Sequence, residues 1–117
     1  EYEKHYPHLS VEKRIGIAEG DVPDSLKPVI YRISQEALNN IAKHSNASLA
    51  DLVVQKVGER LEMTIQDNGH GFQPDEITKG FGLSTMRERA ELSGGTFAVQ
   101  SIKGKGTIIR ASWPLAL

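Results

Sequence analysis

The chain has 117 residues, 38% of them hydrophobic and 25% charged, which is the size and composition of one soluble globular domain. Its formal net charge of −1 gives no sign of nucleic-acid or anionic-membrane binding, and its lack of cysteine excludes disulfides and thiolate metal sites. No apolar stretch approaches the ~20 residues that span a bilayer. We expect a cytoplasmic domain, which the lack of cysteine fits, and its parent protein can still be membrane-anchored.

The N-terminal segment, residues 1–9, is polar and aromatic, contains Pro7 and shows no clear period. We therefore interpret it as the lead-in from an upstream segment, and we expect one domain at residues 10–117. Apolar residues within 11–17 predict a first strand, which the turn sequence at 20–23 closes.

A helix is predicted after this turn, because apolar residues recur every three or four positions from Leu26 to about His44. Asp24 or Ser25 can cap its first turn, which tolerates Pro28. The residues expected on its buried face are Leu26, Ile30, Ile33, Ala37 and Ile41.

Two hairpins and a second helix are predicted in the rest of the chain. The first hairpin joins the β-branched segment 48–57 to an alternating apolar strand at 61–66. The second helix runs from Leu83 to the glycine pair at 94–95, and the last hairpin covers 96–113. The residues expected to face inward from the second helix are Leu83, Met86 and Ala90, with Leu92 as a further candidate.

This order of elements predicts an α+β domain, with one mixed, mostly antiparallel sheet and its helices packed on one face. A doubly wound parallel sheet does not fit, because the strands come in hairpins rather than separated by crossover helices.

Polar residues at helical spacing give the first sign of chemistry. Glu36 and Asn40 lie four apart on the first helix, and Lys43 and His44 continue the same stripe. A solvated helix surface explains the charged members, but asparagine is a poor helix former, so Asn39-Asn40 suggests a use for the side-chain amide. One neutral oxygen ligand suits Mg²⁺ that is held chiefly by nucleotide phosphates and water.

Asp67-x-Gly69-x-Gly71 follows the end of a buried strand. A tight turn explains Asp-Asn-Gly alone, but the second glycine exceeds what a turn requires. Glycine lets a flat ligand approach the backbone, and a buried carboxylate beside it can accept a hydrogen bond from an exocyclic amine such as that of adenine.

Two further glycine motifs are weak when taken alone. Gly80-Phe81-Gly82-Leu83 precedes the second helix, where free N–H groups can bind phosphate. Gly104-x-Gly106-Thr107, taken by itself, is better explained as a hairpin turn. The phosphate-loop and Rossmann patterns are both missing from the sequence.

The order and spacing of these four motifs resemble the asparagine box and the three glycine boxes of the GHKL ATPases, over about residues 11 to 115. The segments 31–44 and 82–95 resemble the histidine kinases of the nitrate-sensor and membrane-thermosensor type. The short link between Phe72 and Phe81 is also typical of that family, whereas most other histidine kinases have a longer nucleotide lid.

The resemblance implies a role for each motif residue. Asn40 would coordinate the Mg²⁺ of bound ATP, and Glu36 would act one turn earlier as the catalytic base or through a water. Asp67 would accept the adenine amino group. The other residues implied are Lys43 and His44 near the phosphates, Gly69, Gly71 and Thr107 around the base, Gly80 and Gly82 in the lid, and Ile41, Ile65 and Leu83 in the pocket wall.

The function implied is that of the ATP-binding catalytic domain of a two-component sensor histidine kinase, which phosphorylates a histidine on a dimerisation domain outside this chain. None of the four histidines lies in a segment suited to be the acceptor. The expected partners are that domain and a response regulator, with no nucleic acid, and the isolated domain is expected to be monomeric. The alternatives are an anti-sigma-factor-type serine kinase, which shares these boxes, and a nucleotide-sensing module without transfer activity.

Overall fold

The computed structural model describes residues 8–71 and 82–115. Two main helices and a five-stranded sheet make up the domain. The strands are β1 (Ser10–Gly16), β2 (Leu49–Val57), β3 (Arg60–Asp67), β4 (Thr96–Ile102) and β5 (Gly106–Pro114). The helices are α2 (Lys27–Asn40), continued by a π-helical turn at Ile41–Ser45, and α3 (Leu83–Leu92), with a short 3-10 turn at Glu19–Asp21.

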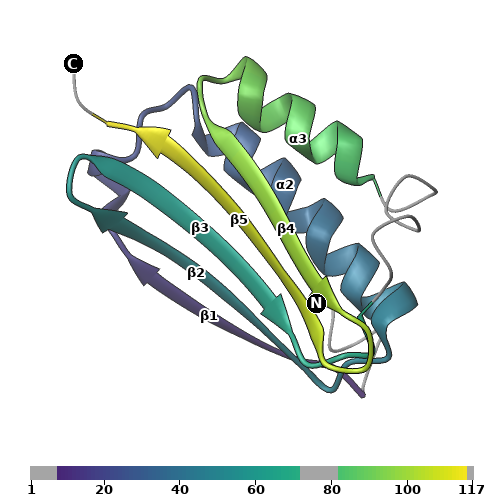
Figure 1. The fold of residues 1–117 in the computed structure, drawn as a ribbon. Coiled ribbons are helices and arrows are strands. Elements are labelled where there is room, and N and C mark those ends of the chain that lie inside the picture. The colour runs from purple at the N-terminus through teal and green to yellow at the C-terminus, as the bar shows by residue number, and fades with distance from the viewer. Residues whose placement is uncertain (1–7, 72–81, 116–117) are drawn as a thin grey trace.

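The sheet has the strand order β1-β2-β3-β5-β4 (Figure 1). β1 and β2 are parallel, because α2 carries the chain back between them, and every other neighbouring pair is antiparallel. The insertion of β5 between β3 and β4 places Asp67, the last residue of β3, opposite Thr107 near the start of β5. The predicted α+β class, with one mixed sheet, is confirmed.

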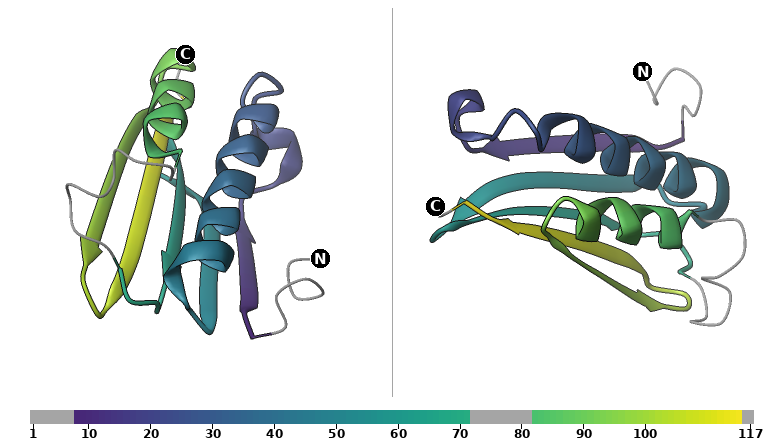
Figure 2. Two further views of the ribbon diagram at one scale, coloured as in Figure 1. Left: turned by 90° about the vertical axis from the view of Figure 1, so that its right-hand side faces the viewer. Right: turned by 90° about the horizontal axis from the view of Figure 1, so that it is seen from above.

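Both helices lie on one face of the sheet, α2 towards the β1 margin and α3 over β4 and β5 (Figures 1 and 2). Burial alternates along β3 and β5, as expected for strands covered on one face. The largest fully buried side chains, which form the core between the layers, are Leu9, Ile33, Leu61, Met63, Ile65, Met86 and Trp113.

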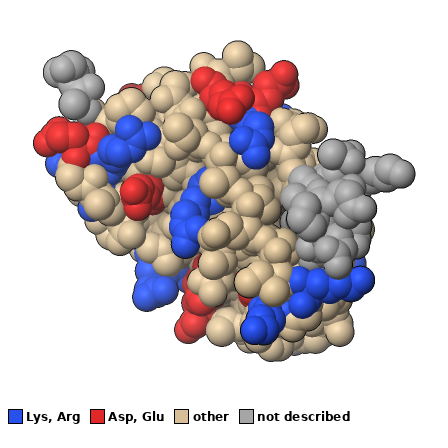
Figure 3. Space-filling view, viewed as in Figure 1, with Lys and Arg blue, Asp and Glu red and all other residues tan. Residues whose placement is uncertain are grey.

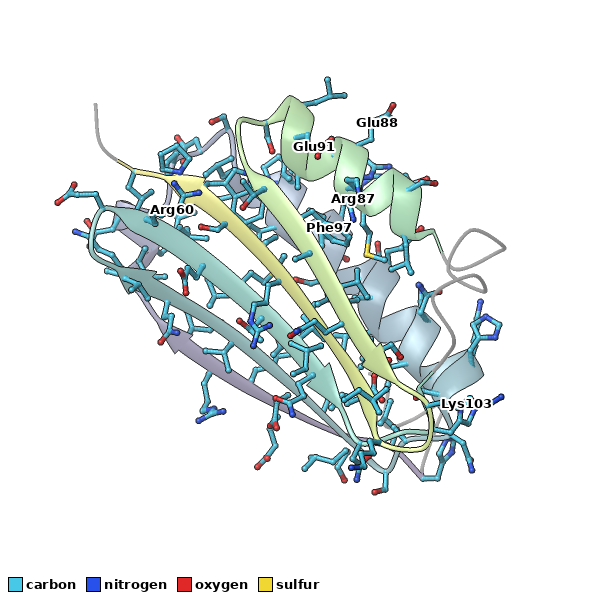
Figure 4. The ribbon with its side chains drawn as sticks, viewed as in Figure 1. Arg60, Arg87, Glu88, Glu91, Phe97 and Lys103 are labelled. Carbon is cyan, nitrogen blue, oxygen red and sulfur yellow. The ribbon has the colours of Figure 1, made fainter. Side chains whose placement is uncertain are left out.

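Helix α3 also contacts β4, one of the two edge strands of the sheet. The guanidinium of Arg87 lies over the ring of Phe97 on β4, 5.3 Å from its centroid, and its Nη1 donates a hydrogen bond of 3.1 Å to the Phe97 carbonyl oxygen (Figure 4). Glu88 and Glu91 on the same helix are exposed. A backbone acceptor of the edge strand is thereby satisfied within the domain.

Three local expectations differ from the structure. Leu92 is 83% exposed, because it lies two residues, or about 200° of helical rotation, beyond the buried Ala90. Neither Asp24 nor Ser25 caps α2: Leu26 precedes the helix without a side-chain cap, and Asp24 forms an ion pair of 3.2 Å with Lys27 instead. Leu9, which we assigned to the lead-in, is buried in the core.

Acidic and basic side chains are interspersed on the face seen in Figure 3, with no large patch of one sign. This distribution agrees with the near-zero net charge of the sequence. Within residues 8–71 and 82–115, no helix combines the length and apolar character needed to cross a membrane.

Candidate nucleotide-binding site

A cavity lies where the C-terminal end of α2 meets the adjoining ends of β3 and β5. Helix residues, the loop after β3, the first residue of α3 and two β5 residues all contribute to it. The lining residues are Ala37, Asn40, Ile41, His44, Ser45, Asp67, His70, Gly71, Leu83, Thr107 and Ile109. Segments that are far apart in the sequence therefore meet at one concave site.

The helix side of the cavity is shaped by the π-helical turn that ends α2. Ser45 Oγ donates a hydrogen bond of 2.7 Å to the Ile41 carbonyl oxygen and accepts one of 3.2 Å from the Ala47 N–H. Asn46 then adopts a left-handed conformation with φ of 55° and stops the helix. Such wide turns are frequent at functional sites, and this one carries His44 and Ser45 at the cavity.

Asp67 is the buried charged group of the site, with 6% of its surface exposed. Its Oδ1 accepts a hydrogen bond of 2.7 Å from the Gly69 N–H, while its carboxyl group lines the cavity. Burial raises the pKa of the Asp67 carboxyl above its ordinary value of 3.8, although the Gly69 hydrogen bond and the nearby His70 act in the opposite direction. Burial therefore outweighs these two stabilising contacts and disfavours the charged form of the carboxyl.

Thr107 faces Asp67 across the β3–β5 pair and is also buried. Its hydroxyl shares a hydrogen bond of 3.0 Å with the hydroxyl of Ser101 on β4. A carboxylate and a hydroxyl thus lie side by side at the floor of the cavity, where they can bind a ligand that offers a hydrogen-bond donor.

The glycines of the Asp67 loop allow backbone segments to pack closely. A Cβ on Gly69 would overlap the backbone of Ser45, and the neighbouring His70 N–H donates a hydrogen bond of 2.9 Å to the Ser45 carbonyl oxygen. Gly71 has a φ of 68° and lies against the carbonyl oxygen of Ile102. These contacts tie the loop to the end of α2 and to the β4–β5 hairpin, a use that the sequence alone did not indicate.

Gly82 lies directly against the carboxyl group of Glu36. A Cβ built on Gly82 would overlap Glu36 Oε1, and the φ of 66° at Gly82 also disfavours any larger residue. The start of α3 can therefore approach the half-buried Glu36 only because residue 82 is glycine.

The structure gathers most of the predicted site residues, but not all of them. Asn40, His44, Asp67, Gly71, Leu83 and Thr107 line the cavity, as does the predicted wall residue Ile41. Glu36 lies beside Gly82, and Gly69 packs behind the cavity on Ser45. Gly80 lies outside the described residues.

Two other residues that the sequence predicted for the nucleotide site lie outside the cavity lining. Lys43 is exposed and lines a separate groove between α2 and β1. Ile65 is buried in the core, and its cross-strand partner Ile109 lines the cavity in its place.

Four residues that line the cavity were not among the site residues predicted from the sequence: Ala37, Ser45, His70 and Ile109. A signal existed for most of them. Ala37 and Ser45 lie four residues on either side of Ile41, and Ile109 lies two residues beyond Thr107 on the same face of β5.

The family model described as histidine kinase-, DNA gyrase B-, and HSP90-like ATPase matches residues 25–117 of the chain. The chain belongs to this ATPase family. The ATPase domain is 39% identical over 108 residues to the sensor histidine kinase YxjM of Bacillus subtilis, covering 92% of this chain and 26% of that protein. It is also 41% identical over 88 residues to the signal transduction histidine-protein kinase/phosphatase UhpB of Salmonella typhimurium, covering 75% of this chain and 18% of UhpB.

Solved structures share the fold of this ATPase domain. The histidine kinase domain from the blue-light activated histidine kinase of Erythrobacter litoralis EL346 superposes with a TM-score of 0.82 at 20% identity, covering 97% of this chain and 56% of that one. The histidine kinase AdeS of Acinetobacter baumannii gives a TM-score of 0.76 at 16% identity, covering 99% of this chain and 58% of the AdeS chain. The domain is therefore an ATP-binding catalytic domain of the histidine-kinase type, and it spans about a quarter or less of the curated relatives described above.

Proposed function

We propose that the cavity binds the adenine end of Mg²⁺-ATP and that the domain presents the γ-phosphoryl group to a histidine on a domain outside this chain. The observation that carries the proposal is the buried Asp67 carboxylate beside Thr107 on the floor of a cavity that also contains Asn40. In phosphoryl transfer the protein takes little part in the covalent chemistry. The roles to assign to its residues are therefore positioning of the reacting groups and neutralisation of the phosphate charge.

Asp67 is proposed to select the base. Its Oδ1 is already used by the Gly69 N–H, so the remaining acceptor capacity of the carboxylate is available to the exocyclic amine of adenine. A donor at this point would also relieve the cost of burying the charge. Ile41, Leu83 and Ile109 supply apolar walls for the ring faces.

Asn40 is proposed as the protein ligand of Mg²⁺. Within residues 8–71 and 82–115, no group of three or more histidine, cysteine, aspartate or glutamate side chains could hold a metal ion. A site with one amide oxygen suits Mg²⁺, which keeps several waters and is bound largely by substrate phosphates. When bound, the ion would neutralise phosphate charge.

Glu36 is proposed as the base that polarises the attacking histidine, and Gly82 as the residue that lets the start of α3 approach it. His44 lines the cavity and is proposed to approach the phosphates. Lys43 lines a groove on another side of α2, so we leave it out of the proposed phosphate contacts.

The acceptor and the partners are proposed by analogy with the relatives, which are named a sensor histidine kinase and a signal transduction histidine-protein kinase/phosphatase. Two of the four histidines, His44 and His70, line the cavity and so are unsuited to be acceptors. We propose a dimerisation domain that carries the acceptor, a cognate response regulator, a cytoplasmic location where ATP is available, and a monomeric state for this domain alone.

Two measurements test the proposal. Calorimetry should show that ATP binds weakly without Mg²⁺ and more tightly with it, and an absence of binding at millimolar ATP under both conditions would refute the nucleotide assignment. The domain should then be incubated with [γ-³²P]ATP and the isolated acceptor domain of a relative such as YxjM. Acid-labile phosphate on that domain supports histidine transfer, whereas acid-stable phosphate indicates a serine kinase.

A further inference from the structure

A second concave surface of the described chain is separate from the nucleotide cavity. It is a groove of about 1120 Å³ between α2 and β1, with part of β2 as its floor. Helix α2 packs against β3, and α3 against β4 and β5, so the helix layer of the described chain leaves the β1 margin of the sheet thinly covered (Figure 2). The proposed function makes no use of this groove.

The groove has the chemistry of a helix-binding surface. Leu38, Leu52 and Val54 form a buried apolar floor, and the apolar side chains at its mouth are unusually accessible. Ile15 is 62% exposed and Tyr31 is 63% exposed, and both line the groove. An exposed apolar strip between a helix and an edge strand leaves room for one more element in the same layer.

The charges along the groove are uneven. Three lysines, Lys13, Lys27 and Lys43, lie among the lining residues, with Glu19 as the single carboxylate in that set. Lys27 also pairs at 3.2 Å with Asp24, whose side chain is 96% exposed. The lining therefore complements an apolar surface that is flanked by acidic residues.

We propose that this groove docks an acidic amphipathic helix supplied by a partner protein, as a third helix of the α layer. β1 has seven residues and α2 has fourteen, so each side of the groove is about 20 Å long, which matches a helix of about 14 residues. The helix would place apolar residues at i, i+3, i+4 and i+7 on Ile15 and the floor, with glutamates facing Lys13 and Lys27. A concave groove receives a rod, whereas a bilayer would need protruding apolar groups.

The test is fluorescence anisotropy with two labelled peptides that share the same leucine face, one flanked by glutamates and the other by lysines. The 117-residue chain should bind the glutamate peptide saturably and at least tenfold more tightly than the lysine peptide. Ile15→Asp should weaken this binding at least tenfold. The matched control is Ile102→Asp, since Ile102 is the same residue type with the same 62% exposure on β4, outside the groove, and it should leave peptide binding unchanged.

A charge swap gives the sharper test. The double variant Lys13→Glu, Lys27→Glu should reverse the preference in favour of the lysine peptide, and glutamate in the first turn of α2 is compatible with its helix dipole. ATP binding should be unchanged in the Ile15 and lysine variants, because these residues do not line the nucleotide cavity. The peptide experiment would therefore remain a valid test of the groove even if the cavity proved not to bind ATP.

Several results would overturn the docking proposal. These are equal affinity for the two peptides, no saturable binding at millimolar peptide, or a preference that the charge swap leaves in place. Sedimentation of the chain with phosphatidylserine vesicles, abolished by Ile15→Asp, would assign the surface to a membrane. A dimer in analytical ultracentrifugation that Ile15→Asp dissociates would assign it to a second copy.

Discussion

Gly82 and Glu36 are 46 positions apart in the sequence, and the backbone of Gly82 occupies the space beside the Glu36 carboxyl group that a Cβ would fill. The contact links the start of α3 to the centre of α2, next to the cavity that Leu83 also lines. A motif glycine therefore acts here on another side chain of the domain, in addition to any contact that it makes with a ligand.

The first prediction concerns this contact. Gly82→Ala should lower phosphoryl transfer at least tenfold, because the new methyl group displaces Glu36. The left-handed φ adds a stability cost of about 1 kcal/mol. Gly58→Ala is the matched control, since Gly58 has a similar φ of 59° and no atom within 4 Å of the position of its Cβ. Urea unfolding should show similar losses in both variants, and equal transfer rates would refute the role of the Gly82–Glu36 contact.

Glu36→Gln should separate binding from catalysis. The amide keeps the size of the side chain beside Gly82 but removes its capacity to accept a proton, so Mg²⁺-ATP affinity should stay within about twofold while transfer falls by the 10²–10⁴-fold typical of a lost general base. Single-turnover transfer to a separate acceptor domain measures this. Unchanged transfer would make Glu36 a structural residue.

Asn40→Ala should weaken Mg²⁺-ATP binding about tenfold, the effect of losing roughly 1.4 kcal/mol, and should leave Mg²⁺-free ATP binding almost unchanged. Its neighbour Asn39 lines the α2–β1 groove instead of the cavity, so Asn39→Ala is a control of the same chemistry on the same helix. Calorimetry with and without Mg²⁺ distinguishes them. A loss of equal size in both variants would point to a general effect on α2.

Asp67→Asn should reduce ATP affinity at least tenfold and narrow the ATP-to-GTP preference. The amide presents donors as well as an acceptor, and mispaired buried polar groups cost ~1–3 kcal/mol. The amide oxygen can still accept from the Gly69 N–H, so the turn should survive. An unchanged nucleotide preference would remove Asp67 from the site.

The same variant should gain stability at neutral pH. The folded-state pKa of Asp67 is raised above the ordinary value of 3.8. Between pH 3.8 and this raised pKa, the folded state therefore binds more protons than the unfolded state. Stability from this group therefore falls as pH rises through the folded pKa. The advantage of Asp67→Asn in urea unfolding should be largest at pH 7 and should shrink as pH falls toward 3.8. A variant less stable than the wild type at pH 7 would mean that Asp67 serves mainly to hold the turn.

Gly95→Ala should destabilise the domain by about 1–3 kcal/mol, the usual cost of overpacking. A Cβ on Gly95 would lie 2.5 Å from the indole Nε1 of Trp113, which donates a hydrogen bond of 2.8 Å to Ser93 Oγ. The control is Gly20→Ala, because Gly20 has no atom within 4 Å of its added Cβ and no positive φ. Urea unfolding followed by the fluorescence of the single tryptophan measures both variants, and equal midpoints would contradict the prediction.

The sequence by itself determined the elements and the sheet class, because each depends on patterns within a few residues. The period of α2, the alternation along β3 and the stop at Gly94-Gly95 are all local, and the structure confirms each. Leu92 was misplaced for a local reason as well, since its position in the helical period already placed it opposite Ala90.

Tertiary structure alone decided which of the predicted residues meet. The register of β3 with β5 brings Thr107 beside Asp67 and makes Ile109 a cavity wall in place of Ile65. His44 lines the cavity, whereas its neighbour Lys43 lines the groove between α2 and β1. Pairing register and the close approach of distant backbones depend on how the whole chain packs, and local propensity does not encode either of them.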